Sequence, residues 1–382
     1  MRDNLKKQTR NENLGTVLKA VFNLGITSRV EIAEYLNLNK ATVSSLYGEL
    51  SDCGYFIETG RGNSTSVGGR RRNLFMINPD YGYVMSFDLG FNYVDAMKNS
   101  FSGKILRRKR IDTDGLGIFE IIERIKGEVK IEGKDDRSLK GLLGIGFSIH
   151  GIVNDNRIID SPFMDFMGAD IAGIFEEEFS VPVFLENEAN LSAVYERDFG
   201  TESPKSLVAI SIHRGVGAGV VYNGLLNRGA SGKTGEIGRI TDIWGSKTGK
   251  MEDFLSDDAI MKKICSAVGR SVSRQEVAAM YEAGNRQVRR IFSDYVKKLG
   301  VLTYDVSQIY DPTVIYYDYP LFEEIPDVFE KLKSECESLN LNVPVKQMSN
   351  SENVQLLGSF SIVLNNVLGF EEGSIKFKGN YE

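Results

Sequence analysis

The chain has 382 residues, of which 42% are hydrophobic and 26% are charged, and its formal net charge is −6. A chain of this length is too long for one ordinary hydrophobic core, so we expect two or three domains in a water-soluble protein. No apolar run reaches the about 18 residues of a membrane helix, and the first residues lack the apolar core of a signal peptide, which predicts a cytoplasmic protein with no membrane partner.

Charge and cysteine content narrow the classes further. Residues 1–80 carry eleven Lys and Arg against eight Asp and Glu, whereas acidic residues are in excess in the remainder. A basic head on an acidic body indicates a nucleic-acid partner for the head alone. The three cysteines and two histidines fit neither a disulfide framework nor a metal-ligand spacing, so we expect no metal and no cofactor.

Three helices are predicted at the start of the chain. Apolar residues recur at helical spacing over residues 12–24. Ser28 and Glu31 have the spacing of a capping box and open a second, short helix. A third helix is expected from Lys40 to about Cys53, with its apolar positions on one side.

The third helix is the candidate DNA-reading element. Its N-terminal half carries small polar side chains, which suit insertion into a major groove, although a three-helix packing module without DNA explains the pattern as well. The candidate DNA contacts on this helix are Asn39, Lys40, Thr42, Ser44, Ser45 and Tyr47.

A glycine- and serine-rich segment between two short predicted strands, residues 55–59 and 73–77, indicates a β-wing. Its arginines suit phosphates and a narrow minor groove, although a charge run is more often a solvated surface. These candidate DNA contacts are Arg61, Arg70, Arg71 and Arg72. Residues 1–80 are therefore predicted to be a winged helix-turn-helix domain.

Alternating strands and helices follow from Tyr83 onwards. Strands are expected at residues 84–90, 94–97, 142–149 and 181–185, and the last delivers Glu186-Asn187-Glu188 before a helix at 189–199. Ligands of open α/β sheets bind at the carboxyl ends of strands, so these polar residues are well placed, although acidic residues also cap helices for structural reasons alone.

Residues 206–239 contain alternating glycines, Gly215-Val216-Gly217-Ala218-Gly219, and a turn that fixes Glu236 between glycines. Such glycines let a backbone approach a ligand closely, but tight turns use them too. Further helices and strands continue to about residue 368, which predicts two α/β lobes, residues 81–200 and 201–382, with a cleft between them. The last helix is a candidate for returning to the first lobe.

In this order, the motifs resemble the ROK family of sugar-responsive repressors and sugar kinases, and more closely its branch of xylose and N-acetylglucosamine repressors. The quoted matches are Gly68-Gly69-Arg70-Arg71, Gly144-x-Gly146, Glu186-Asn187-Glu188-Ala189-Asn190 and Gly215 to Gly238. The resemblance implies a winged helix-turn-helix followed by a two-lobed, actin-like or ribonuclease H-like sugar-kinase fold.

Departures from the family motifs argue against an enzyme. Glu188 stands where family kinases have their catalytic aspartate, and the phosphate turn reads Asp88-Leu89-Gly90-Phe91-Asn92, with a bulky Phe in place of glycine. The glycine pair of the nucleotide site is replaced by Tyr316-Tyr317-Asp318-Tyr319, and Arg239 replaces the zinc-binding histidine, with no cysteine soon after. The resemblance therefore implies neither a catalytic residue nor a metal here.

The leading expectation is a sugar-responsive DNA-binding regulator, a repressor that works as a homodimer or homotetramer on operator DNA and is released by a small carbohydrate. The expected ligand contacts are Asn187, Glu188, Glu236, Arg239 and Glu252. Arg239 suits a carboxylate or phosphate on the sugar, or else an internal salt bridge to Glu236. Two alternatives stay open: an ATP-dependent sugar kinase with a DNA-binding head, and a repressor that needs no effector.

Overall fold

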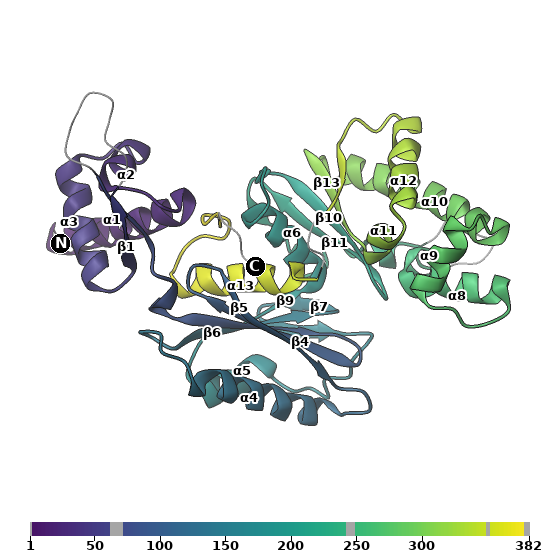
Figure 1. Cartoon of the computed structure of the whole chain (residues 1–382), viewed down its shortest axis with the longest axis horizontal. Helices are drawn as coiled ribbons and strands as arrows, with labels where there is room; N and C mark the ends of the chain where they lie inside the picture. The colour runs from purple at the N-terminus through teal and green to yellow at the C-terminus, as the bar shows by residue number, and fades with distance from the viewer. Residues whose placement is uncertain (1, 62–71, 242–248, 349–351, 378–382) are drawn as a thin grey trace. The chain divides into compact units, whose positions relative to one another are not determined.

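The computed structural model describes residues 2–61, 72–241, 249–348 and 352–377. The chain forms two compact units, Met1–Glu186 with Leu356–Glu382 (unit 1) and Asn187–Gln355 (unit 2), each with its own five-stranded sheet (Figure 1). The predicted α/β fold class, with a helical head and two mixed sheets, is confirmed. Among the helices in these ranges, none is both long and apolar enough to cross a membrane.

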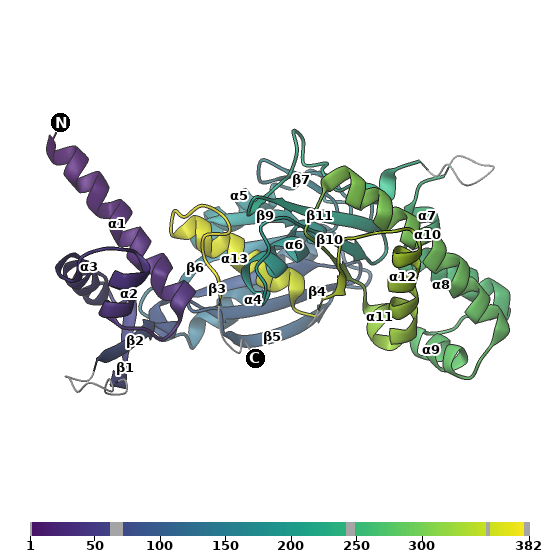
Figure 2. The same ribbon diagram turned by 90° about the horizontal axis from the view of Figure 1, so that it is seen from above.

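Unit 1 begins with three helices and a two-stranded sheet, which Figure 2 shows together at the N-terminal end. Their bounds are α1 Arg2–Leu24, α2 Arg29–Tyr35, α3 Lys40–Asp52, β1 Phe56–Arg61 and β2 Asn73–Ile77. The core of this head consists of apolar residues at the predicted helical spacing, including Val17, Val21, Ile32, Val43 and Leu46, all at most 2% exposed. The antiparallel pair β1–β2 packs beside α3 and forms the predicted wing.

The sheet of unit 1 has the order β5-β4-β3-β6-β9, in which β3 pairs antiparallel with β4 and parallel with β6. Its strands are β3 Tyr83–Leu89, β4 Tyr93–Ser100, β5 Ile105–Asp112, β6 Leu142–Ile149 and β9 Val183–Asn187. Helices α4 Ile118–Lys134 and α5 Ile171–Phe179 cover one face, and α13 Val354–Val367 covers the other (Figure 1). A short hairpin, β7 Ile152–Asn154 and β8 Arg157–Asp160, connects β6 to α5.

The glycines of β6 explain how α13 packs so closely on this sheet. A Cβ at Gly146 would lie 2.1 Å from Oγ of Ser359, and one at Gly144 would lie 2.7 Å from Val363. Any side chain at these positions would push α13 off the sheet. The Gly144-x-Gly146 motif is therefore a packing device between β6 and α13.

The sheet of unit 2 has the order β12-β11-β10-β13-β14, with β10–β13 and β13–β14 parallel and β10–β11 antiparallel. Its strands are β10 Leu207–Ile212, β11 Val216–Tyr222, β12 Leu225–Leu226, β13 Val314–Asp318 and β14 Val345–Gln347. The helices of this unit are α6 Glu188–Asp198, α7 Glu252–Leu255, α8 Asp257–Val268, α9 Arg274–Glu282, α10 Arg286–Tyr310, α11 Pro320–Glu324 and α12 Pro326–Ser338. Residues of β10, β13, α8, α10 and α12 share one hydrophobic core, and Figure 2 shows these helices grouped together.

Candidate functional site

The two helices of the predicted DNA-reading motif are capped at their first turns. Ser28 and Glu31 form the capping box that the sequence predicts for α2. Asn39 caps α3, since its Oδ1 accepts a hydrogen bond of 2.7 Å from the backbone N–H of Thr42. Both caps fix where the helices start, and hence the turn between them. Asn39 therefore has a structural role besides the predicted DNA contact.

The polar side of α3 is largely open to solvent. Lys40 and Ser45 are exposed, and Thr42 and Ser44 are half-buried. Tyr47 lies elsewhere: its ring packs against Phe75 of β2 at 4.4 Å between ring centroids and against Phe56 of β1 at 5.6 Å. Tyr47 thus joins α3 to the wing, a packing role that the helical pattern alone did not indicate.

The wing carries two described arginines at its outer end. Arg61 is exposed and opposes Asn73 in the register of β1 and β2. Arg72 lies 3.7 Å from Oε1 of Glu31, the acid of the α2 capping box, so it is paired with the first turn of the helix-turn-helix. Arg70 and Arg71 lie outside the described residues.

In unit 2, Asn187 and Glu188 lie at the start of α6. Oδ1 of Asn187 accepts hydrogen bonds from the backbone N–H groups of Ala189 and Asn190, and its amide donates to Oε2 of Glu188 at 2.8 Å. This places the Glu188 carboxylate at the positive end of the helix dipole. Both residues are half-buried, so they combine the helix-capping role with partial access to solvent.

The alternating glycines of β11 are explained by packing inside unit 2. A Cβ at Gly219 would lie 2.1 Å from the carbonyl oxygen of Ala189 on α6, and one at Gly235 would lie 1.7 Å from that of Ala218. A Cβ at Gly238 would lie 2.3 Å from the oxygen of Val216. At Gly217 a Cβ would lie 3.1 Å from the Cβ of Ala189 and 3.7 Å from Oε1 of Glu188, so this position is less crowded than Gly219. These close approaches fix α6 and the 235–239 turn against β11, and thereby the polar residues on both.

Arg239 is paired as one of the two sequence interpretations predicted. Its Nε lies 2.7 Å from Oε2 of Glu236, with both side chains about one-third to one-quarter exposed. Glu252 lies in α7, which contacts the turn that holds Arg239, and it pairs with Lys250 at 3.3 Å. Glu236, Arg239 and Glu252 are therefore brought onto neighbouring elements of unit 2, each with an internal ionic partner.

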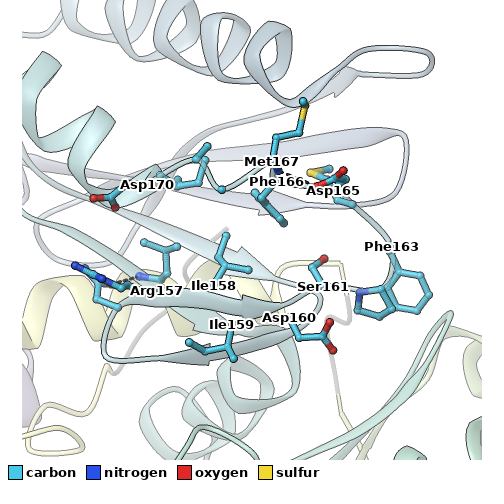
Figure 3. Close-up of a pocket in the computed structure, with 17 residues that line it drawn as sticks. Arg157, Ile158, Ile159, Asp160, Ser161, Phe163, Asp165, Phe166, Met167 and Asp170 are labelled. Carbon is cyan, nitrogen blue, oxygen red and sulfur yellow. Dashed lines mark hydrogen bonds between the residues drawn. The ribbon is translucent and has the colours of Figure 1, made fainter.

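Unit 1 contains a pocket of about 700 Å³ that none of the sequence motifs indicates (Figure 3). It is lined by β8, by the loop between β8 and α5, and by Leu185 of β9. Its lining combines aromatic and sulfur-containing side chains with acidic ones, and Arg157 is the basic residue among those that line it. The side chains that give it this character are Asp160, Ser161, Phe163, Met164, Asp165, Phe166 and Met167. An apolar surface beside one hydroxyl and three carboxylates suits a polar neutral guest.

The family resemblance places nucleotide phosphates at the β3–β4 turn. In this structure, the ring of Tyr93 lies against Gly90 of that turn. A Cβ at Gly90 would lie 2.4–2.7 Å from ring atoms of Tyr93, so the Tyr93 ring rests directly on this glycine. The guanidinium of Arg110 stacks on the same ring at 4.0 Å and forms two hydrogen bonds with Asp95, which raises the pKa of Arg110. The Tyr93 ring therefore occupies the space on the side-chain face of Gly90.

The residues at the end of β13 form part of the interior of unit 2. Tyr317 and Tyr319 are fully buried, and burial raises their pKa values well above the ordinary one. Asp318, 0% exposed, accepts hydrogen bonds through Oδ2 from Ser192 at 3.1 Å and from Gln355 at 2.6 Å, with Nε2 of His213 at 3.4 Å. The bulky rings thus pack in the core, and the carboxylate organises a buried polar network.

The zinc site of the family has no counterpart among the residues that the structure places. Within the described ranges, no three His, Cys, Asp or Glu side chains gather closely enough to hold a metal ion. The resemblance places Arg239 where the family has a histidine, and the sequence has no cysteine between Cys53 and Cys265. A cation in place of a ligand would repel a metal ion, so the residues present do not fit zinc.

Comparison with known proteins agrees with this architecture. The model of the ROK family matches residues 84–363. The chain is 36% identical to the xylose repressor of Lactiplantibacillus pentosus, over 98% of this chain and 97% of the relative. It is 34% identical to the xylose repressor of Staphylococcus xylosus, over 96% and 98%. A solved ROK family transcriptional regulator, described as a homologue of the Escherichia coli MLC protein, superimposes with a TM-score of 0.79 at 19% identity, covering 96% of this chain and 98% of the other.

The family match covers most of the chain, and the xylose repressors match it almost from end to end, including the head that lies outside the family model. These full-length relatives are named as repressors and not as kinases. The chain therefore belongs to the ROK family, as a transcriptional regulator of the xylose repressor-like type.

Proposed function

We propose that this regulator represses genes of carbohydrate utilisation and that a neutral sugar, with xylose as the first candidate, releases it from its operator. The observation that carries the proposal is the similarity to xylose repressors along the whole chain, joined to a head with a capped α3 and a wing. Xylose is the first candidate because both of these relatives are named xylose repressors.

For DNA reading, α3 would enter the major groove with its N-terminal half. Lys40, Thr42, Ser44 and Ser45 supply hydrogen-bonding side chains on the open side of that helix. Arg61 and Arg72, with Arg70 and Arg71 between them in the sequence, would contact backbone phosphates beside the groove. A homodimer or homotetramer in the cytoplasm would then read two half-sites whose spacing matches that of its heads.

For the effector, the proposed contacts are the sequence-predicted set in unit 2, namely Asn187, Glu188, Glu236, Arg239 and Glu252. The pocket of unit 1 is a separate candidate surface for a sugar, considered by itself. Three aspartates line that pocket against a single arginine, Arg157, and Arg239 of unit 2 already pairs with Glu236. These charges favour an uncharged sugar over a phosphorylated or acidic one, because a phosphate would meet more carboxylates than cations.

We also propose that the protein does not phosphorylate the sugar. The Tyr93 ring on Gly90 blocks the backbone that would hold phosphate oxygens, and Glu188 replaces the family's catalytic aspartate with a side chain one methylene longer. Misplacing a catalytic group by about 1 Å costs on the order of a hundredfold in rate. Binding of the sugar, without its conversion, is the function that these residues retain.

A thermal-shift screen tests the proposal. Xylose, glucose, N-acetylglucosamine, xylose 5-phosphate and ATP are added separately to the full chain. A ligand at 100 times its Kd adds about 2.7 kcal/mol of stability, which corresponds to a rise in Tm of about 5 °C or more. We expect this rise with a neutral sugar and none with ATP or the phosphate.

Two variants sharpen the screen. Glu188→Gln keeps the shape of the side chain but removes its charge, and is expected to abolish the sugar shift. Glu177→Gln, at an exposed position of α5, is the matched control and should keep it. A Tm rise with ATP, together with sugar-dependent release of ADP, would instead support a kinase, and no response to any sugar would support a repressor without an effector.

A further inference from the structure

The last segment of the described chain is docked on the first helix of the head. Along α1, Gly15, Lys19, Phe22 and Asn23 lie on one face, because their spacing follows the helical repeat. Nζ of Lys19 lies 4.6 Å above the ring of Phe370, and a Cβ at Gly15 would touch the same ring at 3.2 Å. Residues 370–377, here named the C-terminal strap, therefore run along this face of α1.

The side-chain amide of Asn23 forms two hydrogen bonds with the backbone of the strap, one as donor and one as acceptor. Its Nδ2 donates to the carbonyl oxygen of Ser374 at 3.2 Å, and its Oδ1 accepts from the backbone N–H of Lys376 at 2.7 Å. Next to it, Phe22 meets Phe377 edge to face at 6.0 Å between ring centroids. A side-chain amide that pairs with a backbone in this way fixes both the position and the direction of the strap.

The strap is in turn anchored to α13. Phe377 is 5% exposed, and its ring packs on Phe360 of α13 at 5.3 Å between centroids. Ile375 is fully buried. The strap therefore joins α13 to α1 through packed rings and hydrogen bonds, so a displacement of α13 would be passed on to α1.

The other end of α13 belongs to unit 2. Gln355, in its first turn, is the last residue of that unit, and the rest of the helix belongs to unit 1. Nε2 of Gln355 donates to the buried Oδ2 of Asp318 at 2.6 Å and lies 3.4 Å from Oγ of Ser192. Oδ1 of Asp318 has no hydrogen-bond partner within the described residues, so this carboxylate depends on the donors at Oδ2. Because a buried carboxylate is strongly destabilised when it loses a hydrogen-bond donor, we expect Gln355 to stay bound to Asp318.

Ser192 connects this network to a proposed effector residue. Its hydroxyl lies 3.1 Å from Oδ2 of Asp318 and 3.1 Å from the backbone oxygen of Glu188, one turn earlier in α6. The contacts thus run from Glu188 through Ser192, Asp318 and Gln355 into α13, and from Phe360 through the strap to α1.

We propose that α13 and the C-terminal strap form the element through which effector binding repositions the DNA-reading head, with Gln355 and Asn23 as its two positioning residues. This inference rests on the proposed function, since it requires a sugar that weakens operator binding. It adds the route of contacts through which sugar binding and operator binding are linked. Substitutions at Gln355 and at Asn23 can remove these contacts separately.

The experiment measures the coupling separately from each binding event. Operator affinity is measured by fluorescence anisotropy, on a duplex selected by the protein from a randomised pool, with and without saturating xylose. Xylose affinity is measured by calorimetry without DNA. The ratio of the two operator Kd values is the coupling, for which allosteric proteins typically give about 5–150-fold.

Two variants cut the two ends of the route. Gln355→Met removes the donor to Asp318, and Asn23→Ala removes the strap's amide partner. Each is expected to leave the xylose Kd within about threefold of the wild type and to bring the coupling ratio to below about one-third of the wild-type ratio. Gln308→Met is the matched control, because Gln308 of α10 also donates to a serine hydroxyl of unit 2, that of Ser307, but touches neither Asp318 nor α13.

The outcomes separate this inference from the proposed function. A wild type whose operator affinity ignores every sugar removes both. A wild type that responds, with Gln355→Met and Asn23→Ala responding equally well, removes the route alone. If either variant melts below the assay temperature, the other decides, because the two substitutions lie in different units.

Discussion

A substitution at Gly219 tests most directly whether the glycines of β11 are needed for the packing of α6. A Cβ there would lie 2.1 Å from the carbonyl oxygen of Ala189 and 2.6 Å from the Cβ of Ala193, whereas ordinary contacts begin at 3.4 Å. Both obstacles are on α6 and neither is a flexible side chain. Gly219→Ala must therefore push α6 away from β11 by about 1 Å.

Overpacking of this kind costs about 1–3 kcal/mol. For a unit of the size of residues 187–355, 2 kcal/mol corresponds to a fall in Tm of about 4–8 °C. Because α6 carries Asn187 and Glu188 at its first turn, we also expect the affinity for the effector to fall by at least about tenfold. Differential scanning calorimetry and titration calorimetry on the full chain measure the two effects.

Gly217→Ala is the matched control two residues away on the same strand. Its Cβ would meet Ala189 at 3.1 Å and no backbone atom, so a small adjustment is enough and the loss of stability should stay below about 1 kcal/mol. If Gly219→Ala melts at the same temperature as Gly217→Ala, the glycines are not explained by the packing of α6, and the reasoning is refuted.

Three further predictions concern the head and a buried acid. Asn39→Ala removes the cap of α3, so we expect a loss of about 1 kcal/mol in a thermal melt together with weaker operator binding; unchanged values of both would contradict the cap's role. Arg72→Ala is expected to lower the slope of log Kd against log salt by about 1, whereas an unaltered slope would mean that Arg72 contacts no phosphate. Burial, with repulsion from Asp318, raises the pKa of Glu196 from 4.5 to about 7, so the wild type should lose stability as pH rises between these values. Glu196→Gln should abolish that loss and be up to about 3 kcal/mol more stable at pH 8, and an equal pH profile in urea unfolding would refute it.

The head could be predicted in detail because its signals are local. The capping box of Ser28 and Glu31, the apolar stripe of α3 and the strand at residues 73–77 all depend on neighbours a few residues away. The packing of Tyr47 could not be predicted, because it depends on Phe56 and Phe75, whose position beside α3 is set only by the folded wing. A polar ring on the open side of a helix gives the same local pattern whether it faces solvent or a strand.

Strand β5 shows why one element of the sheet escaped prediction. Its centre reads Arg107-Arg108-Lys109-Arg110, which lacks the alternation of apolar residues that marks a strand. The structure pairs these cations with buried acids contributed by other elements, Asp95 on β4 and Glu128 and Glu132 on α4. The charges of this edge strand are thus balanced by acids distant in sequence, and they also protect the open edge of the sheet.

In unit 2, the sequence indicated which residues are polar but not what they contact. Glu236 and Arg239 are three residues apart, so their pairing could be proposed in advance, and the structure contains it. The network of Ser192, Asp318 and Gln355 joins residues up to 163 positions apart, and only the folded sheet brings them together. Of the tyrosines that stand in place of the family's glycine pair, Tyr317 and Tyr319 pack in the core, and Asp318 between them forms the network.

We expect that binding of the sugar, without its phosphorylation, changes the affinity of this protein for operator DNA. Fluorescence anisotropy of the selected operator duplex, titrated with the full chain in the presence and absence of saturating xylose, tests it most directly. We expect tight binding without sugar, at least about fivefold weaker binding with it, and no effect of ATP on either curve. Operator binding that is the same with every neutral sugar, or that changes with ATP instead, would contradict it.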